Sequence, residues 1–182
     1  MRIITGSARG ARLKAPPGDG TRPTADRTRE ALFSMLGSRV PDARVLDLFA
    51  GTGALGLEAL SRGAQSAVLI DRATCAVLAE NVRRTRMEEC AEIRRGDVYG
   101  QAAELAHDGR AFDLIFADPP YGQGDNARVL VAAGGLLAPG GLLVLEQGAT
   151  EDVSAQAGGL SLVRERRYGA ARICFYTQEV QA

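Results

Sequence analysis

Short, mostly apolar runs alternate with longer amphipathic segments through most of the chain. The runs have the length and composition of buried strands. They cover residues 44–49, 65–71, 91–97, 111–118 and 140–148. Between them apolar residues recur at helical spacing, which predicts helices. The helices cover residues 53–63, 73–86, 98–108 and 126–136. This alternation predicts an α/β fold, with helices covering both faces of a parallel sheet.

Both ends of the chain depart from this alternation. Residues 160–169 and 170–178 are strand-like and are joined only by a turn, so they must pair antiparallel. Residues 2–16 alternate β-prone pieces with glycine, which predicts a small hairpin. A helix is expected from Asp26 to a stop at Gly37. The whole pattern predicts a mostly parallel seven-stranded sheet, with an antiparallel C-terminal hairpin and a small N-terminal hairpin and helix.

Length and composition indicate one globular domain. The chain has 182 residues, 46% of them hydrophobic and 24% charged, which suffices for one well-packed core. No apolar run approaches the roughly 20 residues that span a bilayer. The first ten residues lack the apolar stretch of a secretory signal. We therefore expect a cytoplasmic protein.

The charge distribution adds a candidate partner. The formal net charge is zero, yet residues 1–39 hold eight Lys or Arg against three Asp or Glu. This local excess suits contacts with nucleic-acid phosphates, although a solvated, lopsided surface would have the same composition. We divide the single domain, residues 1–182, into a basic N-terminal extension, residues 1–39, and an α/β core, residues 40–182, which would hold any catalytic site.

Cysteine and histidine are sparse. The chain has three widely separated cysteines and one histidine, His107. No CxxC or Cys/His spacing occurs, so we expect no bound metal. A Ser-His-Asp mechanism would have to use His107, and we do not expect one.

A glycine-rich turn follows the first predicted strand. Gly51, Gly53 and Gly56 fit G-x-G-x-x-G, and Asp71 follows about twenty residues later at the end of the next strand. Glycines let the backbone approach a ligand, and an acidic side chain there can accept hydrogen bonds from ribose hydroxyls. The motif predicts a nucleoside-containing ligand, either NAD or S-adenosylmethionine. A plain tight turn is the alternative.

Acidic residues end three successive predicted strands, where open α/β sheets bind ligands. They are Asp47, Asp71 and Asp97. Asp47 can hold an ammonium group, which S-adenosylmethionine has and NAD lacks. Asp97 can accept a hydrogen bond from an adenine amino group. With the antiparallel end of the sheet, these acids favour S-adenosylmethionine.

The fourth predicted strand ends in Asp118-Pro119-Pro120-Tyr121, and two prolines cannot continue a central strand. The stretch resembles the (D/N/S)-P-P-(Y/F/W) motif of S-adenosylmethionine-dependent amino-methyltransferases, which modify exocyclic nitrogens of bases or a glutamine amide. The resemblance implies that Asp118 and the Pro119 carbonyl accept hydrogen bonds from an amino group. It also implies that Tyr121 stacks on the base. Such acceptors stabilise the positive charge that develops on the nitrogen.

Longer blocks resemble one narrower family. The blocks are residues 2–16, 22–36, 47–64 and 113–122. They look like the bacterial 16S ribosomal RNA guanine-N2 methyltransferases, compact Rossmann-like enzymes with a short basic N-terminal extension. The resemblance implies methyl transfer from S-adenosylmethionine to one loop guanine in the head of the small ribosomal subunit. The implied partner is the assembled or assembling subunit, and we expect a monomer without membrane association.

Carried over by position, the resemblance assigns three sets of residues. The catalytic set is Asp118, Pro119, Pro120 and Tyr121. The cofactor set is Asp47, Phe49, Gly51, Gly53, Asp71, Arg72, Asp97, Val98 and Asp118. The RNA set is Arg2, Arg9, Arg12, Lys14, Arg22, Thr24 and Arg27, with Arg22 and Thr24 near the active-site mouth.

Three alternatives share parts of this pattern. Another amino-methyltransferase, such as a DNA adenine-N6 enzyme or one acting on a different rRNA or tRNA base, would have the same fold and motif. An NAD-dependent oxidoreductase would have the same glycine turn. A nucleic-acid-binding module with a vestigial nucleotide pocket would have the same basic extension.

Overall fold

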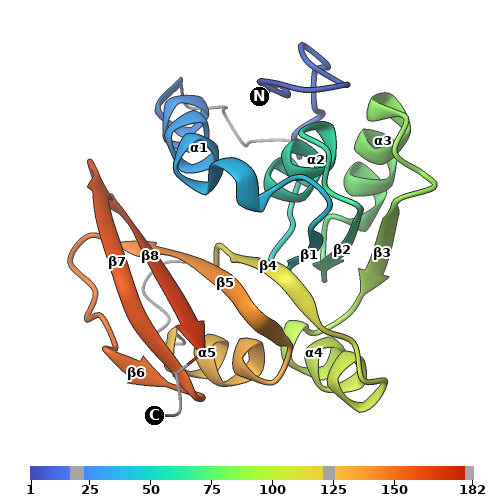
Figure 1. Cartoon of the computed structure of the whole chain (residues 1–182). Helices are drawn as coiled ribbons and strands as arrows, with labels where there is room; N and C mark the ends of the chain where they lie inside the picture. The colour runs from blue at the N-terminus through green and yellow to red at the C-terminus, as the bar shows by residue number, and fades with distance from the viewer. Residues whose placement is uncertain (17–22, 121–125, 179–182) are drawn as a thin grey trace.

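The computed structural model describes residues 1–16, 23–120 and 126–178, which form one eight-stranded sheet with flanking helices (Figure 1). The strands lie in the order β3-β2-β1-β4-β5-β8-β7-β6. They are β1 (Arg44–Asp47), β2 (Ser66–Asp71), β3 (Ala91–Arg95), β4 (Phe112–Ala117), β5 (Leu137–Gly148), β6 (Gln156–Ala157), β7 (Leu160–Tyr168) and β8 (Ala171–Gln178). The helices are α1 (Pro23–Leu36), the short 3₁₀ helix η1 (Gly37–Arg39), α2 (Ala54–Ser61), α3 (Cys75–Thr85), α4 (Val98–His107) and α5 (Asn126–Gly134).

The parallel part of the sheet changes its winding direction between β1 and β4. β1 pairs in parallel with β2 on one side and with β4 on the other, so the segments that leave β1 and β4 diverge. Ligands of open α/β sheets bind beside such a point, at the carboxyl ends of the strands. β8 pairs antiparallel with both β5 and β7, which confirms the predicted C-terminal hairpin.

Helices cover both faces of the sheet, with α1, α2 and α3 on one face and α4 and α5 on the other (Figure 1). Phe33 of α1 packs on Phe116 of β4, with ring centroids 5.7 Å apart. The preceding β4 residue, Ile115, packs in the core on the α4–α5 side, because successive side chains of a strand point to opposite faces. Within the described ranges, no helix has the length and apolarity needed to cross a bilayer.

The structure corrects the predicted elements in four places. Eight strands are described rather than seven, because the two-residue β6 pairs with the start of β7. β5 begins at Leu137, since the β4–β5 ladder continues past an irregularity. The predicted N-terminal hairpin is present in a reduced form, as one antiparallel bridge, Arg2↔Arg12, with backbone hydrogen bonds between its two arms from Ile3 N to Ala11 O and from Leu13 N to Met1 O. Helix α1 begins at Pro23, because proline suits the first turn of a helix.

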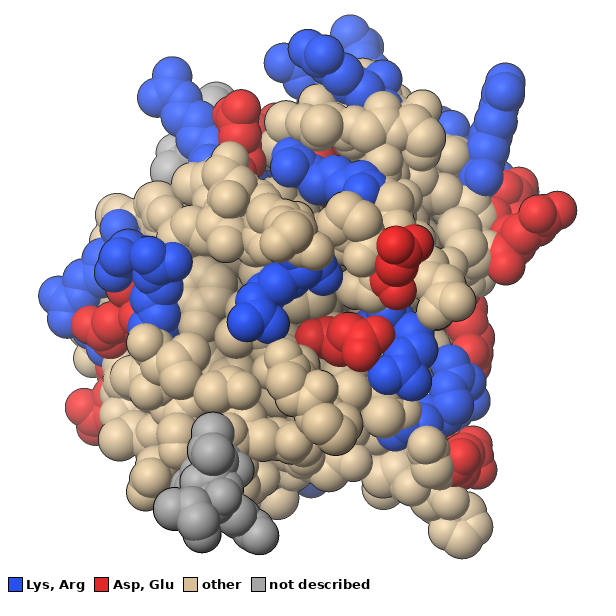
Figure 2. Space-filling view, viewed as in Figure 1, with Lys and Arg blue, Asp and Glu red and all other residues tan. Residues whose placement is uncertain are grey.

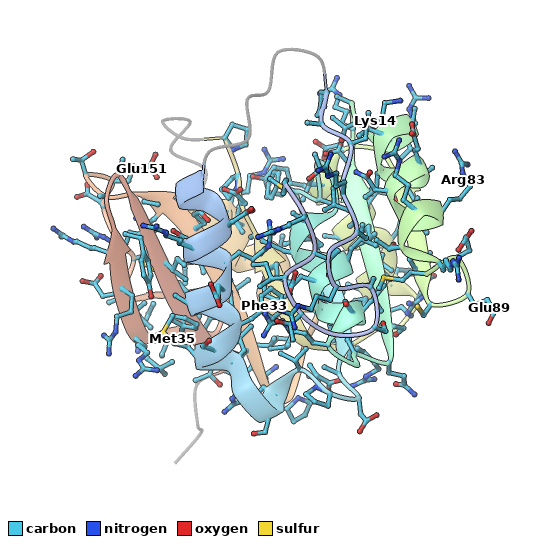
Figure 3. All side chains as sticks on the ribbon, turned by 90° about the horizontal axis from the view of Figure 1, so that it is seen from above. Lys14, Phe33, Met35, Arg83, Glu89 and Glu151 are labelled. Carbon is cyan, nitrogen blue, oxygen red and sulfur yellow. The ribbon has the colours of Figure 1, made fainter. Side chains whose placement is uncertain are left out.

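Polar side chains of α2 fasten the N-terminal segment, residues 1–16, to the core. Glu58 is fully buried, and its two carboxylate oxygens accept from Ile4 N at 2.7 Å and Thr5 N at 3.1 Å. Ser61 Oγ donates to Thr5 O at 2.6 Å. Figure 3 looks down on this face and shows the segment lying over α2 and beside α1. The segment is therefore an integral part of the α1–α3 layer.

A buried amide joins the same segment to the glycine-rich turn. Asn81 of α3 has no exposed surface. Its Oδ1 accepts from Lys14 N at 2.7 Å, and its Nδ2 donates to Lys14 O and Thr52 O, both at 2.9 Å. Thr52 lies between two glycines of the turn. The Asn81 side chain thus connects the turn directly to the N-terminal segment.

Candidate active site at the carboxyl ends of the strands

A cleft of about 390 Å³ opens at the carboxyl ends of the parallel strands, beside the first turns of α4 and α5. This volume lies within the usual range of small-molecule sites. The lining residues are Phe49, Asp71, Arg72, Ala73, Asp97, Val98, Tyr99, Pro119, Pro120, Asn126, Arg128 and Glu151. The cleft therefore brings together five residues of the predicted cofactor set and both prolines of the predicted catalytic set.

The glycines of the turn have different structural roles. Gly53 has φ 81°, and a Cβ there would lie 2.6 Å from Leu78 Cδ1, so close packing requires this glycine. A Cβ on Gly56 would lie 2.2 Å from Leu69 Cδ2. Gly51 has φ 54°, and the nearest atom to its added Cβ is 4.0 Å away. Open space thus adjoins Gly51, whereas Gly53 and Gly56 allow α2 to pack on its neighbours.

Asp47, the last residue of β1, is buried with an incomplete set of partners. Its Oδ2 accepts from Gly56 N at 3.1 Å, which directs the side chain toward α2. Its Oδ1 is also buried and has no partner within hydrogen-bond geometry, although the Phe49 backbone N–H lies close enough to stabilise the carboxylate. Burial raises the pKa of Asp47 to about 7 and repulsion from Asp71 adds to the rise, against the opposing effect of the Gly56 and Phe49 N–H groups. A buried carboxylate oxygen without a donor is suited to a cationic or hydrogen-bond-donating ligand.

Asp71, the last residue of β2, is held by backbone donors around the turn. Its Oδ1 accepts from Thr74 N at 2.6 Å and Ala73 N at 2.8 Å, and its Oδ2 accepts from Gly51 N at 3.0 Å. Burial alone would raise the pKa of Asp71, but these hydrogen bonds outweigh it and lower the pKa. The side chain is therefore an oriented carboxylate at the edge of the cleft. A carboxylate has about four acceptor positions, so it can still accept from a ribose hydroxyl.

Asp97 immediately precedes helix α4 and lines the cleft together with Val98. Its Oδ2 accepts from Gly100 N at 3.0 Å, as expected for a residue that caps a helix N-terminus. This capping bond holds the exposed carboxyl group at the rim of the cleft, the edge of the sheet where the parallel strands end. Phe49 and Arg72, also from the predicted cofactor set, line the same cleft from the ends of β1 and β2.

Asp118 follows β4 on the α1–α2 side of the rim. Phe116 packs in the core on that side, and strand alternation gives Asp118 the same direction. Asp118 is exposed at the rim. Desolvation by the surrounding protein raises its pKa, and the charges of Glu146 and Asp47 raise it further. Tyr121, the aromatic residue of the predicted motif, lies outside the described residues.

The sequence reasoning missed an acidic residue beside Asp118 and polar residues across the cleft. Glu146 ends the apolar run of β5, and an acid at a strand end was the signal that selected Asp47, Asp71 and Asp97. Tyr99 and Arg128 form a cation–π pair, with the guanidinium carbon 3.7 Å from the ring centroid. No sequence signal joined these two residues, since they meet only when α4 packs beside α5.

The basic residues of the predicted RNA set differ in exposure and in the charges that surround them. Arg2, Arg9 and Arg27 line a second hollow of about 360 Å³, together with Asp26 and Glu30. Figure 2 shows blue side chains gathered over the N-terminal segment, at the top of the view.

The remaining basic residues differ in what they contact. Arg12 is exposed, and Lys14 Nζ pairs with Glu80 at 2.6 Å. Arg29, which contributed to the counted excess of charge, is buried and bonds to Asp26 and the Arg2 carbonyl. Arg22 and the Thr24 side chain lie outside the described residues.

Comparisons with known proteins agree on one family. The model of the family described as conserved hypothetical protein 95 matches residues 1–177. Ribosomal RNA small subunit methyltransferase D of Escherichia coli strain K12 is 36% identical over 185 residues, which cover 100% of this chain and 91% of the relative. This chain belongs to the family described by that model, which includes relatives named ribosomal RNA small subunit methyltransferase D. The protein of the same name from Haemophilus influenzae is 33% identical over 154 residues, covering 80% of this chain and 78% of that protein.

A solved structure agrees with this assignment. The structure of a hypothetical protein from Thermus thermophilus superposes with a TM-score of 0.82 at 36% identity, covering 96% of this chain and 98% of that chain. The family confirms the expected Rossmann-like fold and the expected S-adenosylmethionine-dependent methyltransferase. It leaves no support for the oxidoreductase and vestigial-pocket alternatives. The individual site residues stay predictions, as does the division at residue 39.

Proposed function

We propose that this protein transfers a methyl group from S-adenosylmethionine to the exocyclic N2 of one guanine in a loop of 16S rRNA, in the head of the small ribosomal subunit. We further propose that it acts as a cytoplasmic monomer on assembled or assembling subunits. One observation carries the proposal. Pro119 and Pro120 line the cleft, and Asp118, which precedes them, lies near enough to the buried Asp47 carboxyl group for the Asp47 charge to raise its pKa. Family membership supports the rRNA substrate.

The residues at the rim fit a cationic nucleoside. S-adenosylmethionine supplies an electrophilic methyl group on a positively charged sulfur. The cleft side, with Phe49, Asp71 and Val98, offers an apolar wall and an oriented carboxylate for an adenosine. The α1–α2 side offers Asp47, whose buried oxygen lacks a donor and is suited to the ligand ammonium. The negative charges at the rim favour a ligand that carries positive charge.

Asp118 and Pro119 are suited to handle the amino group of the base. The lone pair of an exocyclic amine is delocalised into the ring, so the nitrogen is a weak nucleophile. Hydrogen bonds from its two N–H groups to the Asp118 carboxylate and the Pro119 carbonyl draw the nitrogen toward a tetrahedral shape. The same acceptors would stabilise positive charge on the nitrogen as the N–C bond forms and the sulfur–methyl bond of the donor breaks, and one N–H proton would then leave to water. Alignment and charge stabilisation of this kind require no histidine.

The basic residues beside α1 supply a phosphate-binding face. Arg2, Arg9 and Arg27 converge on one hollow, and Arg12 is exposed nearby. Phosphate contacts of this type strengthen binding to any RNA and weaken as salt rises. They therefore fix the position of the RNA, while recognition of the target base depends on the Asp118 rim.

Methylation of undermethylated small subunits tests the proposal. Subunits from an Escherichia coli strain that lacks its methyltransferase D are incubated with the protein and labelled S-adenosylmethionine, and the nucleosides are then analysed. Label is expected in N2-methylguanosine. Asp118→Asn is expected to lower the rate at least about 100-fold while binding of the donor, measured by calorimetry, persists. Asp113→Asn, at the far end of the same strand in an exposed ion pair, is the matched control.

The identity of the labelled product decides the substrate. Label in N6-methyladenosine would favour the adenine-modifying alternative, and label in protein would favour a glutamine amide. Full activity of Asp118→Asn would reject the proposed role of the Asp118 rim.

A further inference from the structure

Glu146 lies beside Asp118 on the neighbouring strand. The parallel β4–β5 ladder pairs Ala117 with Leu145, so the next residue of each strand stands side by side at the carboxyl end. Val144 packs in the core on the α1–α2 side, and alternation directs Glu146 to the same side as Asp118. The charge of Glu146 acts on Asp118, which agrees with this placement.

Three neighbouring strands therefore present carboxyl groups in a slanted row on the α1–α2 side. Asp118 after β4 and Glu146 of β5 are level with each other, and Asp47 of β1, which pairs with Phe116, lies two residues further back. Like charges this close repel one another and oppose folding. Asp47 adds a fully buried oxygen without a donor at one end of the row. Groups that donate hydrogen bonds or carry positive charge would relieve this arrangement. The residues that line the cleft proposed to hold the adenosine do not include Glu146.

The two donors of guanine match the Asp118 end of this row. Guanine presents N1–H and the N2 amino group side by side on one edge. Adenine instead presents a lone pair at N1, which a carboxylate repels. A carboxylate that must accept a hydrogen bond in the complex discriminates strongly against a base that lacks the matching donor.

We propose that Glu146 is the specificity-determining residue that selects guanine, by accepting a hydrogen bond from N1–H while Asp118 accepts from the N2 amino group. This inference rests on the proposed function and names the group that chooses the base. A carboxylate has about four acceptor positions, so Glu146 can take the N1–H in addition to the contacts it already makes. Its charge also increases electron density on N2, since N1 and N2 are joined through C2.

A base analogue isolates this contact. 2-Aminopurine keeps the amino group at C2 but has a lone pair at N1 in place of the N–H. Small subunits are reconstituted with 16S rRNA that carries guanosine or 2-aminopurine riboside at the position that the wild-type protein methylates. The initial methylation rates of the two substrates are then compared for wild type, Glu146→Gln, Glu146→Asp and the control Glu88→Gln. Glu88 is exposed in the turn after α3.

The wild type and Glu88→Gln are expected to prefer guanosine by about tenfold or more. Glu146→Gln, whose amide can donate to the analogue N1, is expected to reduce this preference to less than about threefold. Glu146→Asp is expected to be slower but to keep the preference. Donor binding, measured by calorimetry, is expected to match wild type in both Glu146 variants, which shows that they fold.

Two results would overturn the inference, and they are distinguishable. If wild type methylates guanosine N2 but Glu146→Gln slows both substrates by the same factor, Glu146 has only a structural role. If wild type places no methyl group on guanosine N2, the proposed function itself fails.

Discussion

The buried charge of Asp47 predicts that Asp47→Asn makes the protein more stable and less able to bind its donor. Burial raises the pKa of Asp47 from 3.8 to about 7. A carboxyl group whose pKa is raised in the folded state binds its proton more tightly there than in the unfolded chain. Stability is therefore greatest below the unfolded value and is lost as pH rises from about 4 to about 7.

The size of this effect follows from the pKa. Each tenfold change in proton affinity is worth about 1.4 kcal/mol, so ionisation of Asp47 costs the folded state at most about 4 kcal/mol at neutral pH. Asparagine removes the charge and can still accept from Gly56 N. The asparagine NH₂ group would take the position of the partnerless aspartate oxygen, Oδ1. Burying this NH₂ group without an acceptor costs about 1–3 kcal/mol of folding stability. The variant is thus expected to gain about 1–3 kcal/mol at pH 8.

Urea unfolding at two pH values measures the effect. The difference in unfolding free energy between variant and wild type is expected to widen by about 3 kcal/mol between about pH 5 and about pH 8. This widening does not depend on the cost of the asparagine amide. Calorimetry is expected to show donor binding weakened at least about tenfold, because the ammonium loses its counter-charge. A free-energy difference that is the same at both pH values would refute the reasoning that Asp47 is ionised and buried.

Three further substitutions test the packing around the site, each by urea unfolding. Gly56→Ala is expected to cost about 1–3 kcal/mol, because its Cβ would lie 2.2 Å from Leu69 Cδ2. Asn81→Ala is expected to cost about 3 kcal/mol and to release the N-terminal segment to limited proteolysis, because three buried hydrogen bonds are lost. Glu58→Ala is expected to cost about 3–5 kcal/mol, because it removes a fully buried carboxylate that accepts from the Ile4 and Thr5 backbone N–H groups and pairs with Arg62.

One control serves all three substitutions. Arg44→Ala removes an exposed ion pair with Asp113 and is expected to cost less than about 1 kcal/mol. An Asn81→Ala variant with unchanged protease resistance would contradict the anchoring of the N-terminal segment. Gly56→Ala with wild-type stability would show that the Leu69 side chain or α2 can shift to make room for the added methyl group. Glu58→Ala no more costly than Arg44→Ala would show that water reaches the Glu58 site.

The sequence predicted the elements well where local patterning is strong. Continuous apolar runs and helical spacing identified the five parallel strands and their helices, because both faces of this sheet are covered. The element boundaries were weaker. Pairing with a neighbouring strand, which the chain itself does not encode locally, extended β5 back to Leu137 and created the two-residue β6.

Of the candidate site, the sequence by itself determined the residues at strand ends, because parallel strands bring successive carboxyl ends to one edge. Asp47, Asp71, Asp97 and Asp118 follow from that rule alone. Only the tertiary structure decided which side of the rim each faces and which donors each meets. Gly51, Ala73 and Thr74 satisfy Asp71, whereas one oxygen of Asp47 is left without a donor. The register of β4 against β5 brings Glu146 to Asp118 from 28 residues along the chain, and such contacts between distant segments depend on packing rather than local pattern.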